Sequence, residues 1–253
     1  MKICLIQTDI RWQDTPSNIR QVRDLMDAHP DADLYVLPEM WNTGFVTSPT
    51  EQEHTGSQEA IAWMAHTAHS KQCHIIGSVA TKVEGRFRNR LYAFGPDGEM
   101  EHYDKRHLFG YGGEHLNYQA GSRRVVMECC GVRLLLQVCY DLRFPVFSRN
   151  KGDYDMAIYV ASWPESRRHV WDTLLRARAI ENQCYVCGVN RVGSDPACNY
   201  SGGSALIDAY GRTVLDLGNE CGAQTAVIDM ERLAGFREKF NVLNDADRFE
   251  ITL

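Results

Sequence analysis

The sequence contains no hydrophobic run long enough to cross a membrane and no cluster of basic residues. The apolar stretch near the N-terminus stops at Gln7, and residues 156–161 form about the longest later run, whereas a signal peptide needs roughly 7–15 apolar residues and a membrane span about 18. With 27 Lys and Arg against 33 Asp and Glu, the formal charge is −6, which disfavours nucleic acid and anionic membranes as partners. We therefore expect a soluble, cytoplasmic protein that binds neither.

The sequence also lacks Pro/Gly/Ser-rich linkers, low-complexity tracts and internal repeats. A chain of 253 residues buries roughly 70–75% of the surface that it exposes when unfolded, so its stability requires neither disulfides nor a metal. We expect one domain spanning residues 1–253. The nine cysteines of a cytoplasmic chain should then be thiols that are either buried or used for chemistry.

Hydrophobic patterning predicts an α/β chain of about twelve strands and four or so helices. Strands are expected over residues 2–8, 34–37, 74–83, 87–94, 100–104, 124–128, 132–138, 155–161, 185–190, 204–208, 212–217 and 225–229. Helices are expected over 15–29, 57–72 and 165–181, the last with a single apolar stripe of Val170, Leu174, Ala177 and Ile180. Residues 105–122 have no clean period, and a loop this long is usually functional or mobile.

Two residues stand where buried strands end. Cys139 follows the strand 132–138 at a sharp turn, where the backbone N–H groups that open the next helix are free to bind an anion. Glu39 ends the short strand 34–37, at the edge where α/β folds place catalytic groups. The alternatives are a buried strand-end cysteine and a solvated glutamate.

The irregular loop adds two charged residues. Lys105 opens it, and an ammonium group held in a pocket can stabilise a developing oxyanion. Glu114 follows two glycines that permit close backbone approach. A surface location is the alternative for both side chains.

Three ordered motifs carry a family resemblance. PEMWNTG at 38–44, YDKRHLF at 103–109 and VCYDLRFP at 138–145 resemble the nitrilase superfamily of carbon–nitrogen hydrolases. Three further segments, ASWP at 161–164, ARAIENQ at 177–183 and GVNRVG at 188–193, are similar to its bacterial omega-amidase branch. The resemblance implies a four-layer αββα sandwich of two packed sheets. It also implies a homodimer that pairs through the helical faces.

The resemblance assigns roles to the same four residues. Cys139 is implied as the nucleophile, Glu39 as the general base and Lys105 as the oxyanion stabiliser, while Glu114 helps to orient the base and the lysine. The implied reaction uses no cofactor and proceeds through a thioester. It hydrolyses the terminal amide of short 2-oxo dicarboxylic monoamides, such as 2-oxoglutaramate and 2-oxosuccinamate, to the acid and ammonia. A free thiol has a pKa of about 8.5, so it needs a base or positive neighbours at neutral pH.

Substrate-binding residues follow from the chemistry of such an amide. The backbone N–H of Tyr140 can join Lys105 at the oxyanion. The far carboxylate needs a cation, ideally a bidentate arginine. Arg167 is favoured over Arg168 because the resembling branch has an arginine near there, and the alternative is that both are solvated arginines in the first turn of a helix. Three aromatic side chains are expected to form the walls of a small pocket: Trp163, Phe45 and Tyr111. The alternative for each is packing in the core or at its rim.

Other readings stay open. The chain could instead cleave an N-carbamoyl amino acid, an aliphatic amide or a nitrile, or serve as a non-catalytic scaffold on the same fold. The C-x-x-C at 184–187 has no second pair at zinc spacing, and Cys129-Cys130 is expected to be structural, so no metal site is predicted. Gln137 lies in a buried strand and needs a partner. The loop 109–114 is richer in glycine than the branch leads us to expect.

Overall fold

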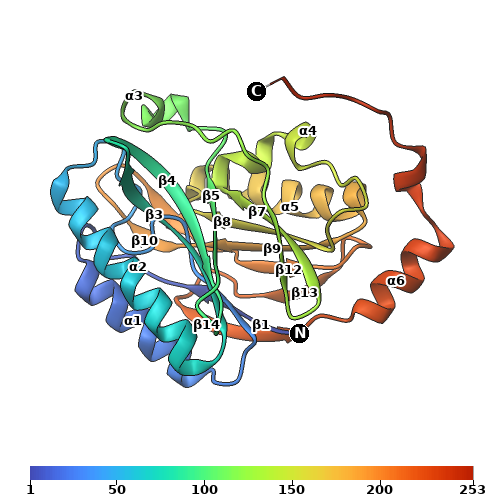
Figure 1. Cartoon of the computed structure of the whole chain (residues 1–253), viewed down its shortest axis with the longest axis horizontal. Coiled ribbons are helices and arrows are strands. Elements are labelled where there is room, and N and C mark those ends of the chain that lie inside the picture. Colours follow the sequence, from blue (N-terminus) through green and yellow to red (C-terminus); the bar gives the residue numbers. More distant parts are fainter. Residues whose placement is uncertain (253) are drawn as a thin grey trace.

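The computed structural model describes residues 1–252 and has two packed six-stranded sheets between layers of helices (Figure 1). The first sheet runs β14 (Gly222–Val227), β1 (Lys2–Gln7), β2 (Leu34–Val36), β3 (His74–Val83), β4 (Arg86–Phe94) and β5 (Met100–Asp104). The second runs β13 (Thr213–Asp216), β12 (Ala205–Ile207), β9 (Tyr185–Asn190), β8 (Met156–Ala161), β7 (Val132–Val138) and β6 (Val126–Cys129). β10 (Val192–Ser194) and β11 (Asn199–Ser201) form a separate hairpin.

Side-chain alternation along β1 shows why the layers form. Ile3 and Leu5 point into the core between the two sheets, whereas Cys4 and Ile6 point into a second core. That second core is covered by α1 (Thr15–Ala28) and α2 (Glu51–Lys71), while α5 (Arg168–Asn182) covers the outer face of the second sheet (Figure 1). Because successive strand residues face opposite ways, a strand buried on both sides reads as a continuous apolar run. The αββα sandwich is confirmed.

The centres of both sheets are parallel, and this places the site. β1, β2 and β3 run parallel in the first sheet, as do β7, β8 and β9 in the second. Since the carboxyl ends of parallel strands meet at one edge, residues that follow β2, β7 and β8 converge there. The amide of Glu39, beyond β2, donates to the carbonyl of Ala161 at the end of β8, 3.4 Å away. None of the helices in residues 1–252 is long and apolar enough to cross a membrane.

Several element boundaries differ from the sequence prediction. α2 begins at Glu51 rather than at residue 57, because Thr50 and Glu53 form a capping box at its start. The segment expected to be irregular contains a 3-10 turn, η1 (Gly110–Gly112), and the short α3 (Glu114–Asn117). The hairpin of β10 and β11 and the C-terminal α6 (Met230–Lys239) were not predicted.

The apolar stripe predicted on α5 is not the face that the helix buries. After the 3-10 turn η3 (Glu165–Arg167), α5 buries Trp171, Leu175 and Ala179. The predicted stripe lies at the margin of this face, and its member Ile180 is 51% exposed. The large Trp171 ring, whose Nε1 donates to the carbonyl of Gly203 at 2.8 Å, therefore decides which side of the helix faces the sheet.

Candidate active site

Four predicted residues come together at the carboxyl edge of the parallel strands. Glu39 follows β2, Lys105 follows β5, Glu114 opens α3 and Cys139 follows β7. Glu39 and Glu114 are fully buried, Lys105 is 1% exposed and Cys139 is 9% exposed. The surface locations that the sequence left open for these charges are therefore wrong.

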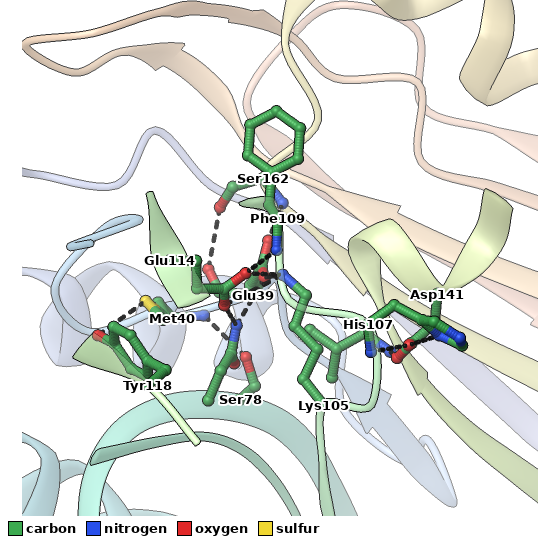
Figure 2. A network of polar contacts seen from close by, with 12 residues as sticks. Glu39, Met40, Ser78, Lys105, His107, Phe109, Glu114, Tyr118, Asp141 and Ser162 are labelled. Carbon is green, nitrogen blue, oxygen red and sulfur yellow. Dashed lines mark hydrogen bonds and ion pairs between the residues drawn. The ribbon is translucent and has the colours of Figure 1, made fainter. Parts of the chain in front are cut away.

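The Lys105 ammonium lies between two carboxylates (Figure 2). Its Nζ is 2.8 Å from Glu39 Oε1 and 2.9 Å from Glu114 Oε2. Burial alone would lower the pKa of Lys105, but the charges of Glu114 and Glu39, with a smaller effect of Cys139, outweigh it and raise that pKa. Lys105 is therefore a permanent cation that the two carboxylates hold in place.

Backbone and amide groups that the sequence did not single out orient the carboxylates. Asn89, on β4, donates from one Nδ2 to Glu39 Oε1 at 2.7 Å and to Glu114 Oε1 at 3.0 Å. The amide of Ser162 donates to Glu39 Oε2 at 2.9 Å, and the amide of Phe109 donates to Glu114 Oε2 at 2.6 Å. Asn89 lies between Arg88 and Arg90 in the mostly charged first half of β4, so the sequence offers no signal that sets it apart.

Burial controls the resting protonation of the site. It raises the pKa of the Cys139 thiol; the nearby Glu39 charge adds to this and Lys105 opposes it. Burial also raises the pKa of Glu114, against the opposing effect of Lys105. The resting cysteine is therefore a thiol next to a carboxylate, and an attack by its sulfur requires a base that takes the proton as the bond forms.

The turn at Cys139 is held by Asp141. Cys139 has φ +45°, a left-handed conformation that a non-glycine residue adopts only at a cost of about 1–2 kcal/mol. Asp141, fully buried, accepts from the amide of Val138 at 2.9 Å and from the Tyr103 hydroxyl at 2.8 Å, and its other oxygen is 2.7 Å from Nδ1 of His107. This network, partly visible in Figure 2, fixes Cys139 at the strand end.

A cavity of about 460 Å³ opens over Cys139 and Lys105. All the predicted pocket residues line it: Phe45, Tyr111, Tyr140, Trp163 and Arg167. The guanidinium of Arg167 lies 5.5 Å from the centre of the Phe109 ring. Arg168 is not in this lining and instead binds Asp172 at 2.8 Å and the carbonyl of Ser201 at 2.6 Å.

Two parts of the cavity were not predicted. Arg143 lines it from the segment after Cys139, with its guanidinium 4.9 Å from the centre of the Trp163 ring. The turn between β10 and β11 also lines it, and the hydroxyl of Tyr200 on β11 donates to Asp195 in this turn at 2.6 Å. Within residues 1–252, neither Arg143 nor Arg167 has a carboxylate within 4.0 Å.

The partner of Gln137 is the backbone. Its Nε2 donates to the carbonyl of Leu136 at 2.7 Å, whereas its Oε1 has no hydrogen-bond partner in the described part of the chain. The side chain belongs to β7 and does not line the cavity. Gln137 therefore has no direct contact with a substrate in the cavity.

Comparisons with known proteins agree with this geometry. A carbon–nitrogen hydrolase family model matches residues 2–238. The chain is 44% identical to Omega-amidase YafV of Yersinia enterocolitica over 98% of both chains, and 36% identical to the 2-oxoglutaramate amidase of Bacillus subtilis over 96% of both. It superimposes with a TM-score of 0.94, at 39% identity, on a CN-hydrolase superfamily protein of Xanthomonas campestris solved with an arsenic adduct in its active site, covering 100% of this chain and 99% of that one. The chain belongs to the carbon–nitrogen hydrolase family, and it is a hydrolase that acts on carbon–nitrogen bonds.

Proposed function

We propose that the protein is a cysteine-dependent omega-amidase that releases ammonia from short 2-oxo dicarboxylic monoamides, with 2-oxoglutaramate and 2-oxosuccinamate as its substrates. The observation that carries the proposal is the buried Glu39–Lys105–Glu114 cluster beside Cys139, under a cavity with two arginines that have no carboxylate partner among residues 1–252. The relatives named as omega-amidase and 2-oxoglutaramate amidase support the same substrate class.

Acylation begins at the Cys139 sulfur. As the sulfur bonds to the amide carbon, Glu39 takes the thiol proton, and the negative charge moves to the carbonyl oxygen. Lys105 and the backbone N–H of Tyr140 hold this oxyanion, and one such donor is worth about 3–4 kcal/mol of barrier. Glu39 then passes the proton to the nitrogen, the carbon–nitrogen bond breaks, and ammonia leaves a thioester on Cys139.

Deacylation reuses the same groups. Glu39 takes a proton from a water molecule as its oxygen adds to the thioester carbon, and the proton returns to sulfur when the acid departs. Glu39 is suited to both steps because the Ser162 amide, Asn89 and Lys105 fix its two oxygens. Glu114 completes the charge environment of Lys105 without lining the cavity, so we propose that it positions the lysine.

The far carboxylate of the substrate is assigned to the arginines. Arg167 and Arg143 both line the cavity, and the rings of Phe109 and Trp163 hold their planar guanidinium groups. An arginine can bind a carboxylate through two parallel hydrogen bonds. We propose Arg167 as the main carboxylate ligand and Arg143 as its neighbour, while Trp163 and Phe45 wall the chain of the substrate.

The direct test is ammonia release from 2-oxoglutaramate by the wild type, by Cys139→Ala and by the control Cys221→Ala, which changes an exposed cysteine outside the site. The proposal expects activity in the wild type and control and none in Cys139→Ala. Normal turnover by Cys139→Ala would refute the mechanism. A parallel panel of an N-carbamoyl amino acid, an aliphatic amide and a nitrile decides between hydrolase substrates, and a protein inactive on all of them would support a scaffold role.

We further propose that residues 1–253 act as one catalytic domain of a cytoplasmic homodimer that needs no cofactor, nucleic acid or membrane. All nine cysteines are free thiols, as a reducing compartment would keep them. The proposed dimer interface includes two exposed apolar side chains, Ile180 on α5 and Phe240 just after α6. Sedimentation equilibrium of the wild type and Ile180→Glu tests this, since a charge in a buried interface should yield monomers.

A further inference from the structure

A second cluster of reactive side chains lies at the opposite edge of the sandwich from Cys139. His74 opens β3, Cys129 ends β6, and Cys130 follows in the turn toward β7. One imidazole nitrogen and the two Sγ atoms lie within 4.8 Å of one another. His74 belongs to the first sheet and the cysteines belong to the second. The cluster therefore joins the two halves of the fold.

The His74 side chain is buried and incompletely paired. The residue is 9% exposed, and its Nδ1 is a buried atom with no hydrogen-bond partner among residues 1–252. Buried polar atoms of native proteins are rarely left without a partner, and such an atom calls for an explanation, which a bound ion can supply. The backbone of His74 is fixed, because its amide donates to the carbonyl of Asp33 at 2.8 Å.

The cysteines are presented by a rigid turn. Cys130 and Gly131 have φ +49° and +76°, the pair of left-handed conformations typical of a tight hairpin. A non-glycine residue pays for this conformation, so Cys130 occupies a strained position. Cys129 is buried at 1% exposure, whereas Cys130 is exposed and opens a path from solvent. Neither cysteine is in a disulfide.

We propose that His74, Cys129 and Cys130 bind a zinc ion that joins the two sheets. Thiolate and imidazole are the ligands that zinc prefers, at about 2.3 Å and 2.0–2.1 Å. Tetrahedral bonds of these lengths place two sulfurs about 3.8 Å apart, so the three ligand atoms, which lie within 4.8 Å of one another, need to draw together by at most about an ångström when the ion binds. A water molecule on the open side of Cys130 supplies the fourth ligand.

The ion has a structural role in this proposal. It lies at the amino end of β3, where Leu34 pairs with His74, and not at the carboxyl edge that carries the nucleophile. An ion that binds only the folded chain stabilises it by mass action. The proposal keeps a structural role for Cys129-Cys130 but departs from the expectation that the chain has no metal site. It does not depend on the proposed amidase substrate.

The test titrates zinc into the full-length, metal-stripped protein under a reducing agent that does not bind metal, in competition with a chromophoric chelator. We expect one zinc per chain and a higher melting temperature with zinc. Changing a residue that only hydrogen-bonds to a metal ligand already lowers metal affinity about 10–100-fold, so removing a ligand itself should lower the zinc affinity by at least about 100-fold. His74→Gln and Cys130→Ser should therefore each lose zinc binding and the thermal shift. Cys221→Ser, an exposed cysteine elsewhere, is the matched control and should keep both.

Three outcomes would overturn the proposal. They are no zinc uptake by the wild type, unchanged uptake by both ligand variants, and loss of uptake in Cys139→Ala, which would move the ion to the catalytic cysteine. Ammonia release by Cys130→Ser, whose changed side chain is exposed, reports that the variant is folded. A wild-type protein that takes up zinc normally but releases no ammonia would contradict the proposed function only.

Discussion

Replacing Asn89 with leucine removes a side-chain amide that, like the Lys105 ammonium, donates to both carboxylates of the site. Its Nδ2 is 2.7 Å from Glu39 Oε1 and 3.0 Å from Glu114 Oε1. A hydrogen bond to a charged group contributes about 1.5–3 kcal/mol, so losing two costs roughly 3–6 kcal/mol. Part of this returns, because Asn89 Oδ1 is buried without a partner in residues 1–252 and its removal recovers about 1–3 kcal/mol.

The net expectation for Asn89→Leu is a loss of about 2–3 kcal/mol in unfolding free energy. The loss of turnover should be larger, because an error of about 1 Å in a positioned group can cost around 100-fold. Urea unfolding and the kcat for 2-oxoglutaramate measure the two effects separately.

Asn150→Leu is the matched control. Asn150 is also buried and donates from Nδ2 to the carbonyls of Tyr154 at 3.0 Å and Asn182 at 2.9 Å, but it does not line the cavity. This control should lose stability and keep the kcat of its folded fraction. An Asn89→Leu enzyme with wild-type kcat would refute the role assigned to Asn89.

Three other substitutions and conditions test the electrostatics. Lys105→Met leaves two buried carboxylates without their cation, so we expect the free energy of unfolding to fall by about 3–5 kcal/mol and kcat to fall about 100-fold or more. A variant as stable as the wild type would contradict the ion-pair geometry. Arg167→Ala should raise the KM for 2-oxoglutaramate by about 10–100-fold and leave the KM for an uncharged amide unchanged. An unchanged KM for 2-oxoglutaramate would show that Arg167 does not bind the substrate. Burial raises the pKa of Cys4 and of Cys184 to about 12 each, so folding stability is full below about pH 8.5 and falls above it by about 1.4 kcal/mol per pH unit for each thiol. Urea unfolding between pH 8 and 10.5 should show a shallower decline for Cys184→Ala, and the same slope would refute this assignment.

The strands were predictable because burial on both faces leaves a continuous apolar signal. β8, buried at every position, was expected over 155–161 and runs from Met156 to Ala161. The order of strands in each sheet has no such local signal, since it depends on which faces pack together, and the sandwich came from the family resemblance. β10 and β11 were missed because their three residues are partly exposed and form no apolar run, whereas β2 and β12, which are equally short, are fully buried and apolar.

Helix ends depend on caps that compete with hydrophobic spacing. The apolar spacing in α2 begins after residue 57, but Thr50 accepts from Gln52 and the Glu53 carboxylate returns to the Thr50 amide, so the helix starts a turn and a half earlier. In α5, the Trp171 ring buries more apolar surface than the stripe residues, so packing decided against the periodicity.

Sequence motifs identified the main site residues, but they did not identify the residues that hold them in place or complete the cavity. Glu39, Lys105 and Cys139 lie in contiguous segments whose residue order is visible in one dimension. Asn89 comes from the middle of β4 and acts across the sheet, so only the folded register brings it to both carboxylates. Arg143 lay inside a quoted motif, but its place in the cavity follows from the 3-10 turn η2 (Cys139–Arg143) that carries it there.

The charges of the site are the reason why we assign the proposed substrate selectivity to the arginines. Lys105 faces two carboxylates in the buried cluster, so its charge is already compensated before a substrate arrives. The chain as a whole carries a net charge of −6, which opposes the approach of an anion. Arg143 and Arg167 lie on aromatic rings in the cavity lining without carboxylate partners in residues 1–252, so their positive charge remains available. A neutral amide gains nothing from that charge, whereas an omega-amide with a far carboxylate is both attracted and oriented by it, with its amide end directed at Cys139.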